Sequence, residues 1–204
     1  MKIKNLIITQ GNHDTWMLEW METGKAPDIW MYQGGKHTKD AYEIFHQDKV
    51  EPHFEFLVNK FVDYYLDTKN RLFVHAGIDP SLPVQQQSFK VLSWDRELHN
   101  AAVITGTDEE KICKLYDTIY IGHTAGPWNE YPMLAGGVWL MDSGAGWDGV
   151  LSMVNIETEQ IFKSDRTFKL YGRNNPRNIA GLFEKKLEEK MNKFFTTRGL
   201  NSSD

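Results

Sequence analysis

Residues 71–77 read Arg-Leu-Phe-Val-His-Ala-Gly, an apolar stretch that stops at a histidine and a glycine turn. The β-branched and aromatic side chains of this run are typical of a buried strand, which we predict over residues 71–75. The same design occurs in residues 8–14, Ile-Thr-Gln-Gly-Asn-His-Asp, and in residues 119–124, Ile-Tyr-Ile-Gly-His-Thr. Each segment therefore predicts a strand that ends in a glycine-containing turn carrying a histidine.

Helical periodicity fills much of the chain between these strands. Residues 51–66, for example, place apolar side chains at steps of three and four, which predicts one amphipathic helix. The predicted helices are 14–22, 38–46, 51–66, 88–99 and 107–115, and the predicted strands are 3–9, 71–75, 118–122, 138–142, 150–156 and 160–163. Asp14 and Thr15 are candidates for the N-cap of the first helix, and Gly24 is expected to end it.

This order of elements predicts an α/β fold. Strands alternate with helices early in the chain, and hairpins follow late, so we expect one sheet domain with a β-rich second layer over residues 1–170. The remaining segment, 171–204, is expected to hold a charged amphipathic helix at 179–195 and a flexible tail.

Composition limits the classes of function. The formal net charge is −5 and the isoelectric point about 5.8, which argues against a nucleic-acid partner, since such proteins present a basic face. Cys113 is the only cysteine, so no internal disulfide can form, and a reducing cytoplasm is the simplest compartment. We expect the Cys113 side chain to be a small buried hydrophobe. The apolar runs have the length of strands, so no membrane span is expected.

The three strand-ending histidine segments predict a metal site. Ligand sites in open α/β sheets gather at the carboxyl ends of strands, so three strands of one sheet would present these side chains on one rim. Imidazole nitrogens and an asparagine oxygen are suitable ligands for divalent transition metals. A single histidine at a strand end is more often structural. It is the occurrence of three such strand-end segments in one chain that indicates a metal site. The other histidines, His37, His46, His53 and His99, lack this context and are expected on the surface or in helices.

In this order, Gly-Asn-His-Asp (11–14), Val-His-Ala-Gly (74–77) and Gly-His-Thr (122–124) resemble the later signature motifs of calcineurin-like metallophosphoesterases. The closest resemblance is to serine/threonine protein phosphatases of the bacterial and bacteriophage type, with symmetrical diadenosine tetraphosphatases as near relatives. The surrounding segments 30–35, 71–80, 92–98 and 141–146 agree, so that the resemblance covers roughly residues 3–163. Asp14 departs from the family pattern, which usually has Glu there.

The resemblance implies a fold and a set of roles. The fold would be a β-sandwich flanked by helices. Asn12, His75 and His123 would ligate one metal of a two-metal centre, His13 would be the general acid, and Arg96 would bind the phosphate. The metal would be Mn²⁺, with Fe or Zn as alternatives. Substrates would be phosphoproteins or small phosphoesters, and hydrolysis of dinucleoside polyphosphates is the alternative activity.

Two motifs that the family places before Gly-Asn-His, namely Asp-x-His and Gly-Asp-x-x-Asp-Arg-Gly, do not occur in these 204 residues. We therefore expect a domain that is incomplete at its N-terminus, lacks the first strands and binds one metal or none. Three interpretations remain open at this point. The chain is a fragment of a working phosphatase, a short non-catalytic binding or scaffold protein, or an unrelated metal-binding domain.

Overall fold

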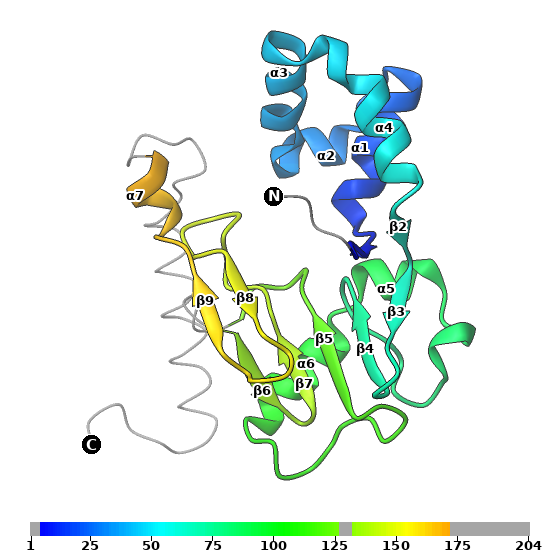
Figure 1. Cartoon of the computed structure of the whole chain (residues 1–204), viewed down its shortest axis with the longest axis vertical. Helices are drawn as coiled ribbons and strands as arrows, with labels where there is room; N and C mark the ends of the chain where they lie inside the picture. The colour runs from blue at the N-terminus through cyan, green and yellow to red at the C-terminus, as the bar shows by residue number, and fades with distance from the viewer. Residues whose placement is uncertain (1–4, 127–131, 172–204) are drawn as a thin grey trace. The chain divides into compact units, whose positions relative to one another are not determined.

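The structure is a computed structural model that describes residues 5–126 and 132–171. Within these ranges it is a mixed α/β fold, as the sequence predicts. The chain divides into two compact units, one of residues 1–124 with 133–141 and the other of residues 125–132 with 142–204. Figure 1 labels the α-helices and most strands of the chain. The helix predicted at 179–195 and the tail after it lie outside the described residues.

The first unit contains a five-stranded sheet with the strand order β3-β4-β5-β7-β6. Its strands are β3 (Tyr64–Leu66), β4 (Arg71–Val74), β5 (Thr118–Ile121), β6 (Met133–Ala135) and β7 (Val138–Leu140). Neighbours β4, β5 and β7 are parallel, whereas the edge strands β3 and β6 run antiparallel to the strands beside them. Because β4 and β5 are parallel neighbours, their carboxyl ends lie at the same edge of the sheet.

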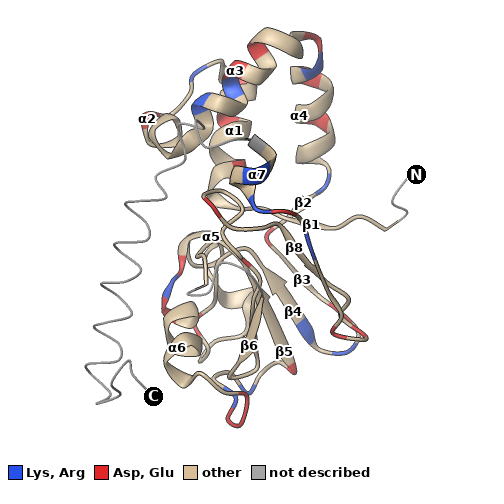
Figure 2. Cartoon of the chain, turned by 90° about the vertical axis from the view of Figure 1, so that its left-hand side faces the viewer, with Lys and Arg blue, Asp and Glu red and all other residues tan. Residues whose placement is uncertain are grey.

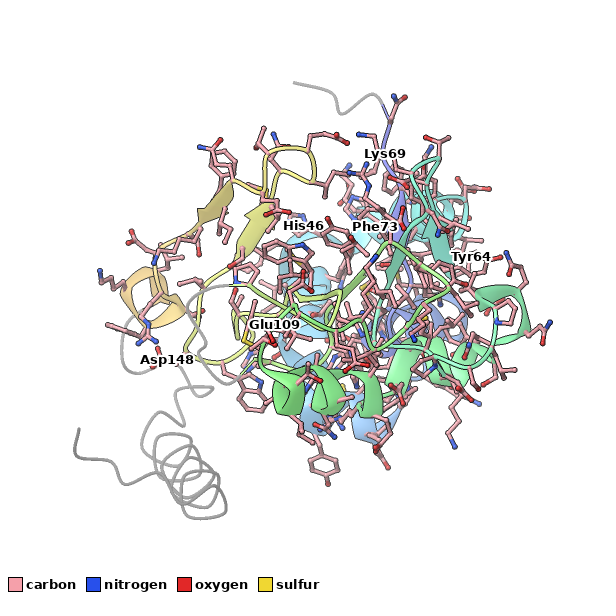
Figure 3. The ribbon with its side chains drawn as sticks, turned by 90° about the horizontal axis from the view of Figure 1, so that it is seen from below. His46, Tyr64, Lys69, Phe73, Glu109 and Asp148 are labelled. Atoms are coloured by element: carbon pink, nitrogen blue, oxygen red, sulfur yellow. The ribbon has the colours of Figure 1, made fainter. Side chains whose placement is uncertain are left out.

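Apolar side chains occupy both faces of this sheet. The segment after β4 forms η3 (Val84–Gln86), α5 (Phe89–Trp94) and α6 (Glu97–Thr105). On one face, Leu72 of β4 and Leu98 of α6 are buried in the same hydrophobic core cluster. On the other face Phe73, labelled in Figure 3, stacks on Tyr120 of β5 at a ring-centroid distance of 4.7 Å. Such strands read as continuous apolar runs, which is why β4 and β5 could be predicted from sequence.

The N-terminal part of the first unit is mainly helical. Its elements are β1 (Ile8–Thr9), α1 (Asn12–Thr23), α2 (Asp28–Trp30), η1 (Met31–Gly35), α3 (Lys36–Phe45), η2 (Gln47–Lys49), α4 (Val50–Val58) and β2 (Phe61–Val62). Strand β1 pairs in parallel with β2 in a separate two-stranded sheet. Trp20 of α1 packs against Trp30 and Tyr42 at ring-centroid distances of 5.8 and 5.7 Å. Charges of both signs lie on α3, including the pair Lys36–Asp40 one helical turn apart, whereas α4 carries only acidic charges (Figure 2).

Several predicted elements are wrong. The predicted helix 51–66 ends at Val58, and residues 61–66 form β2 and β3, because they pair with β1 and β4. Residues 107–115 are not helical, and β6 was not predicted. The N-cap of α1 is Gly11, with Asp14 inside the first turn, where its carboxylate accepts the Gly11 N–H. Gly24 ends α1 in the left-handed conformation as expected.

The second unit is smaller and β-rich. Strands β8 (Ser152–Val154) and β9 (Ile161–Lys163) form an antiparallel hairpin, followed by α7 (Thr167–Tyr171). A loop closes on itself where Gly144 and Val150 form an isolated bridge. The loop needs Gly149, because a Cβ there would lie 1.9 Å from the Ser143 carbonyl oxygen. Across residues 5–126 and 132–171, no helix is both long and apolar enough to cross a bilayer.

Candidate functional site

Three side chains converge where β1, β4 and β5 end. Asn12 is the first residue of α1, directly after β1, and is 3% exposed. His75 follows β4 at once, and His123 comes two residues after β5. The prediction that all three strands belong to one sheet is wrong, because β1 pairs with β2 outside the five-stranded sheet. The three side chains nevertheless meet.

His75 is the centre of this group. Its Nε2 atom lies 3.1 Å from Oδ1 of Asn12 and 3.3 Å from Nδ1 of His123. The two imidazole rings meet edge to face, with centroids 5.1 Å apart. One amide oxygen and one ring nitrogen therefore lie within 3.3 Å of the His75 Nε2 atom, and the three side chains come from different segments of the chain.

The close approach of β1 and β4 depends on Gly11. A Cβ at this position would lie 2.5, 2.6 and 2.7 Å from three atoms of the His75 ring. The Gly11 backbone, at φ −103° and ψ 175°, is ordinary extended chain that any residue adopts. Glycine is thus required here for space and not for conformation, since the His75 ring lies directly against the Gly11 backbone.

Burial keeps His75 neutral. Loss of solvent around the ring, and then the charges of His123 and His13, lower the pKa of His75 from 6.5 to about 4. At pH 7 the ring is therefore uncharged, with one nitrogen carrying a proton and the other a lone pair. Metal ligation by histidine requires this neutral form.

The backbone at His123 is strained. Its φ of 64° is positive, a region that is uncommon outside glycine, although histidine enters it more often than most residues. The Thr124 N–H donates to the Gly122 carbonyl oxygen at 2.6 Å, which closes a three-residue turn centred on His123. The Gly122 N–H in turn donates to the His75 carbonyl oxygen at 2.7 Å, so the turn is tied to the end of β4. Such a conformation costs about 1–3 kcal/mol and is concentrated at functional sites.

An aromatic chain joins the proposed acid to the proposed metal ligand. Trp16 lies one turn after His13 on α1, with ring centroids 5.0 Å apart. The Trp16 ring meets Trp94 at 5.2 Å, and Trp94 meets His123 at 5.7 Å, both edge to face. Sequence reasoning missed both tryptophans as site residues. The spacing of His13 and Trp16 at i and i+3, and the position of Trp94 beside Arg96, were the available signals.

The predicted acid and phosphate ligand are both exposed. His13 is next to Asn12 at the start of α1, and its charge reaches His75. Arg96 is the N-cap of α6, and Asp95 beside it packs so closely on Gly77 that a Cβ there would lie 2.5 Å from the carboxylate. Within the described residues, no hydrogen bond, ion pair or ring contact joins Arg96 to the three converging side chains.

The two distances that join the three donor atoms suit a metal ion. Donors bound at about 2.1 Å to one ion lie about 3.0 Å apart in an octahedron and about 3.4 Å apart in a tetrahedron. The observed 3.1 and 3.3 Å fall in this range, and the donor set of one amide oxygen and two imidazoles suits a first-row divalent ion. No carboxylate completes the set: in the part of the chain that the structure describes, no three His, Cys, Asp or Glu side chains are grouped to hold a metal.

Comparisons with known proteins add little to this site. No protein-family model matches the chain, and no curated protein matches it. One solved structure with some likeness is the crystal structure of hypothetical protein PH1004 from Pyrococcus horikoshii OT3. It shares 12% identity and a TM-score of 0.38, over 97% of this chain and 70% of that chain. At this level the likeness carries no argument about fold or function.

Proposed function

We propose that this chain is a calcineurin-like metallophosphoesterase that hydrolyses phosphate monoesters, in the manner of serine/threonine protein phosphatases. The observation that carries the proposal is the convergence of Asn12 Oδ1 and His123 Nδ1 on His75 Nε2, at 3.1 and 3.3 Å. The β-sandwich flanked by helices that the resemblance implies is part of the same proposal.

Asn12, His75 and His123 would hold the metal, with Mn²⁺ as the first candidate and Fe or Zn as alternatives. A bound divalent ion supplies an activated water and neutralises charge on the phosphoryl group. Burial holds the pKa of His75 at about 4 and so keeps its ring in the neutral form that can bind a metal. The strained turn at His123 aims a second ring at the same point.

His13 and Arg96 act on the substrate in this proposal. His13 is exposed beside the metal ligand Asn12, where it can donate a proton to the leaving alkoxide oxygen. The guanidinium of Arg96 is exposed and offers paired donors to phosphate oxygens. The amino-terminal end of α1, which carries both Asn12 and His13, also favours an anion at this place.

Metal content and phosphatase rate, measured on the purified chain with added Mn²⁺, test the proposal. His75→Ala and His123→Ala should each lower the bound metal. His13→Ala should remove the rate and keep the metal, and Arg96→Ala should raise KM and leave the metal unchanged. His37→Ala is the matched control, because His37 is an exposed histidine on α3.

Unchanged metal content in both ligand variants would refute the ligand assignment. A wild-type chain that binds metal but has no rate would support a non-catalytic binding or scaffold protein instead. Rates on a phosphoserine peptide and on diadenosine tetraphosphate, compared at equal concentration, separate the two candidate substrates.

A further inference from the structure

Trp94 lies behind the strained histidine. The His123 ring has His75 against it, with centroids 5.1 Å apart, and Trp94 against it at 5.7 Å and an interplanar angle of 72°. The backbone of His123 is at a positive φ, in a turn that non-glycine residues seldom adopt. The two ring contacts restrict the directions in which the imidazole can point.

Trp94 is itself held rigidly with respect to His75. It is the last residue of α5, and the Ala76 N–H donates to the carbonyl oxygen of Leu92 in the same helix at 2.8 Å. This bond connects α5 to the residue directly after His75. Ser93 is fully buried, with its hydroxyl donating to the Phe89 carbonyl oxygen at 2.8 Å.

Trp16 supports Trp94 from α1. The two indole rings meet edge to face with centroids 5.2 Å apart, and Trp16 is on the same helix as Asn12. The element that carries the asparagine donor and the helix that carries Trp94 are therefore joined by an aromatic contact. Edge-to-face pairs of this kind have a preferred geometry and resist rotation of either ring.

We infer that Trp94 is a positioning residue, which turns the His123 imidazole towards His75 and Asn12 without touching metal or substrate. The inference rests on the proposed function, because it concerns the ligand set of the proposed metal. Groups that orient a metal ligand without binding the metal affect affinity by about 10- to 100-fold. Trp94 does this by an aromatic contact, where other sites use a hydrogen bond.

The test uses Trp94→Leu, Trp94→Phe and Phe89→Leu. Trp94→Leu should weaken Mn²⁺ and Zn²⁺ binding about tenfold or more in calorimetric titration. Trp94→Phe should keep the affinity within about threefold of the wild-type value. Phe89→Leu is the control, because it makes a similar aromatic-to-leucine change at the other end of α5. It should lower the Tm without changing the affinity for metal.

A metal-free readout separates this inference from the proposed function. In the apo protein, the nuclear Overhauser contact between the His75 and His123 rings should be lost in Trp94→Leu and kept in Trp94→Phe. If the wild type binds no metal, the proposed function fails, and this contact still decides the role of Trp94. An unchanged contact in Trp94→Leu, or wild-type metal affinity in that variant, overturns the inference. If Trp94→Leu does not fold, Trp16→Leu replaces it and should weaken the same contact, since it removes the support behind Trp94.

Discussion

Replacing Gly11 by alanine tests the centre of the site most directly. The new methyl carbon would lie 2.5–2.7 Å from three atoms of the His75 ring, whereas ordinary contacts begin near 3.4 Å. The ring must therefore move away by about 1 Å. The backbone at Gly11 is extended and suits alanine, so the whole effect arises from this collision.

The magnitude follows from what the movement breaks. Overpacking of a buried site costs about 1–3 kcal/mol, and loss of the contact between His75 and Asn12 adds about 0.5–1.5 kcal/mol. The lower entropy of the unfolded alanine chain offsets about 0.4–1 kcal/mol of this. We expect Gly11→Ala to lower the free energy of unfolding by about 2 kcal/mol. Metal affinity should fall at least tenfold, because ligand distances tolerate only about 0.2 Å.

Urea unfolding and calorimetric titration with Mn²⁺ measure the two effects. Gly146→Ala is the matched control, since a Cβ there meets nothing within 4 Å and its φ is not positive. This control should leave metal binding unchanged and stability unchanged or slightly higher. If Gly11→Ala retains wild-type metal affinity and stability, the His75 ring does not lie where the structure has it, and the site argument fails.

Three further predictions address burial, strain and loop closure. Folding lowers the pKa of His75 from 6.5 to about 4, so the free energy of unfolding should fall by up to about 3 kcal/mol as the pH drops through this window. Urea unfolding at pH 7 and pH 4.5 should show a smaller fall for His75→Gln than for the wild type. His123→Gly relieves the strain of the positive φ, so the free energy of unfolding should stay constant or rise by about 1 kcal/mol while metal binding is lost. A fall of more than about 2 kcal/mol would show that the backbone at His123 is not strained. Gly149→Ala places a Cβ 1.9 Å from the Ser143 carbonyl oxygen, so the Val150 amide, which donates to that oxygen, should lose protection from hydrogen exchange; retained protection would show that the loop can adapt.

Local sequence predicted the parallel strands β4, β5 and β7 of the sheet and missed its edge strands β3 and β6. Strands β4 and β5 are short apolar runs with clear stops at His75 and Gly122, and both predictions are confirmed. The predicted helix 51–66 failed in its second half. Its apolar spacing continues past Val58, but residues 61–62 pair with β1, which is distant in sequence, and residues 64–66 form a hairpin with β4. Strand pairing thus overrode a local helical pattern.

The candidate site shows the same difference between local features, which can be predicted, and contacts between distant residues, which cannot. Sequence alone identified Asn12, His75 and His123 as strand-end side chains, because residue type and the adjacent glycine are local features. It also predicted a buried Cys113, which is 4% exposed. The contribution of Trp94 was not visible, since a ring contact between residues 94 and 123 is a property of the folded chain.

The sequence therefore predicted the chemistry of the site, namely which metal-donor groups exist and that each follows a strand. The tertiary structure decided their geometry. Parallel pairing of β4 with β5 brings His75 near His123, and the missing side chain of Gly11 lets Asn12 reach them from a different sheet. The low pKa of His75 and the positive φ of His123 also arise only on folding, because burial and strain depend on neighbours that the unfolded chain does not have.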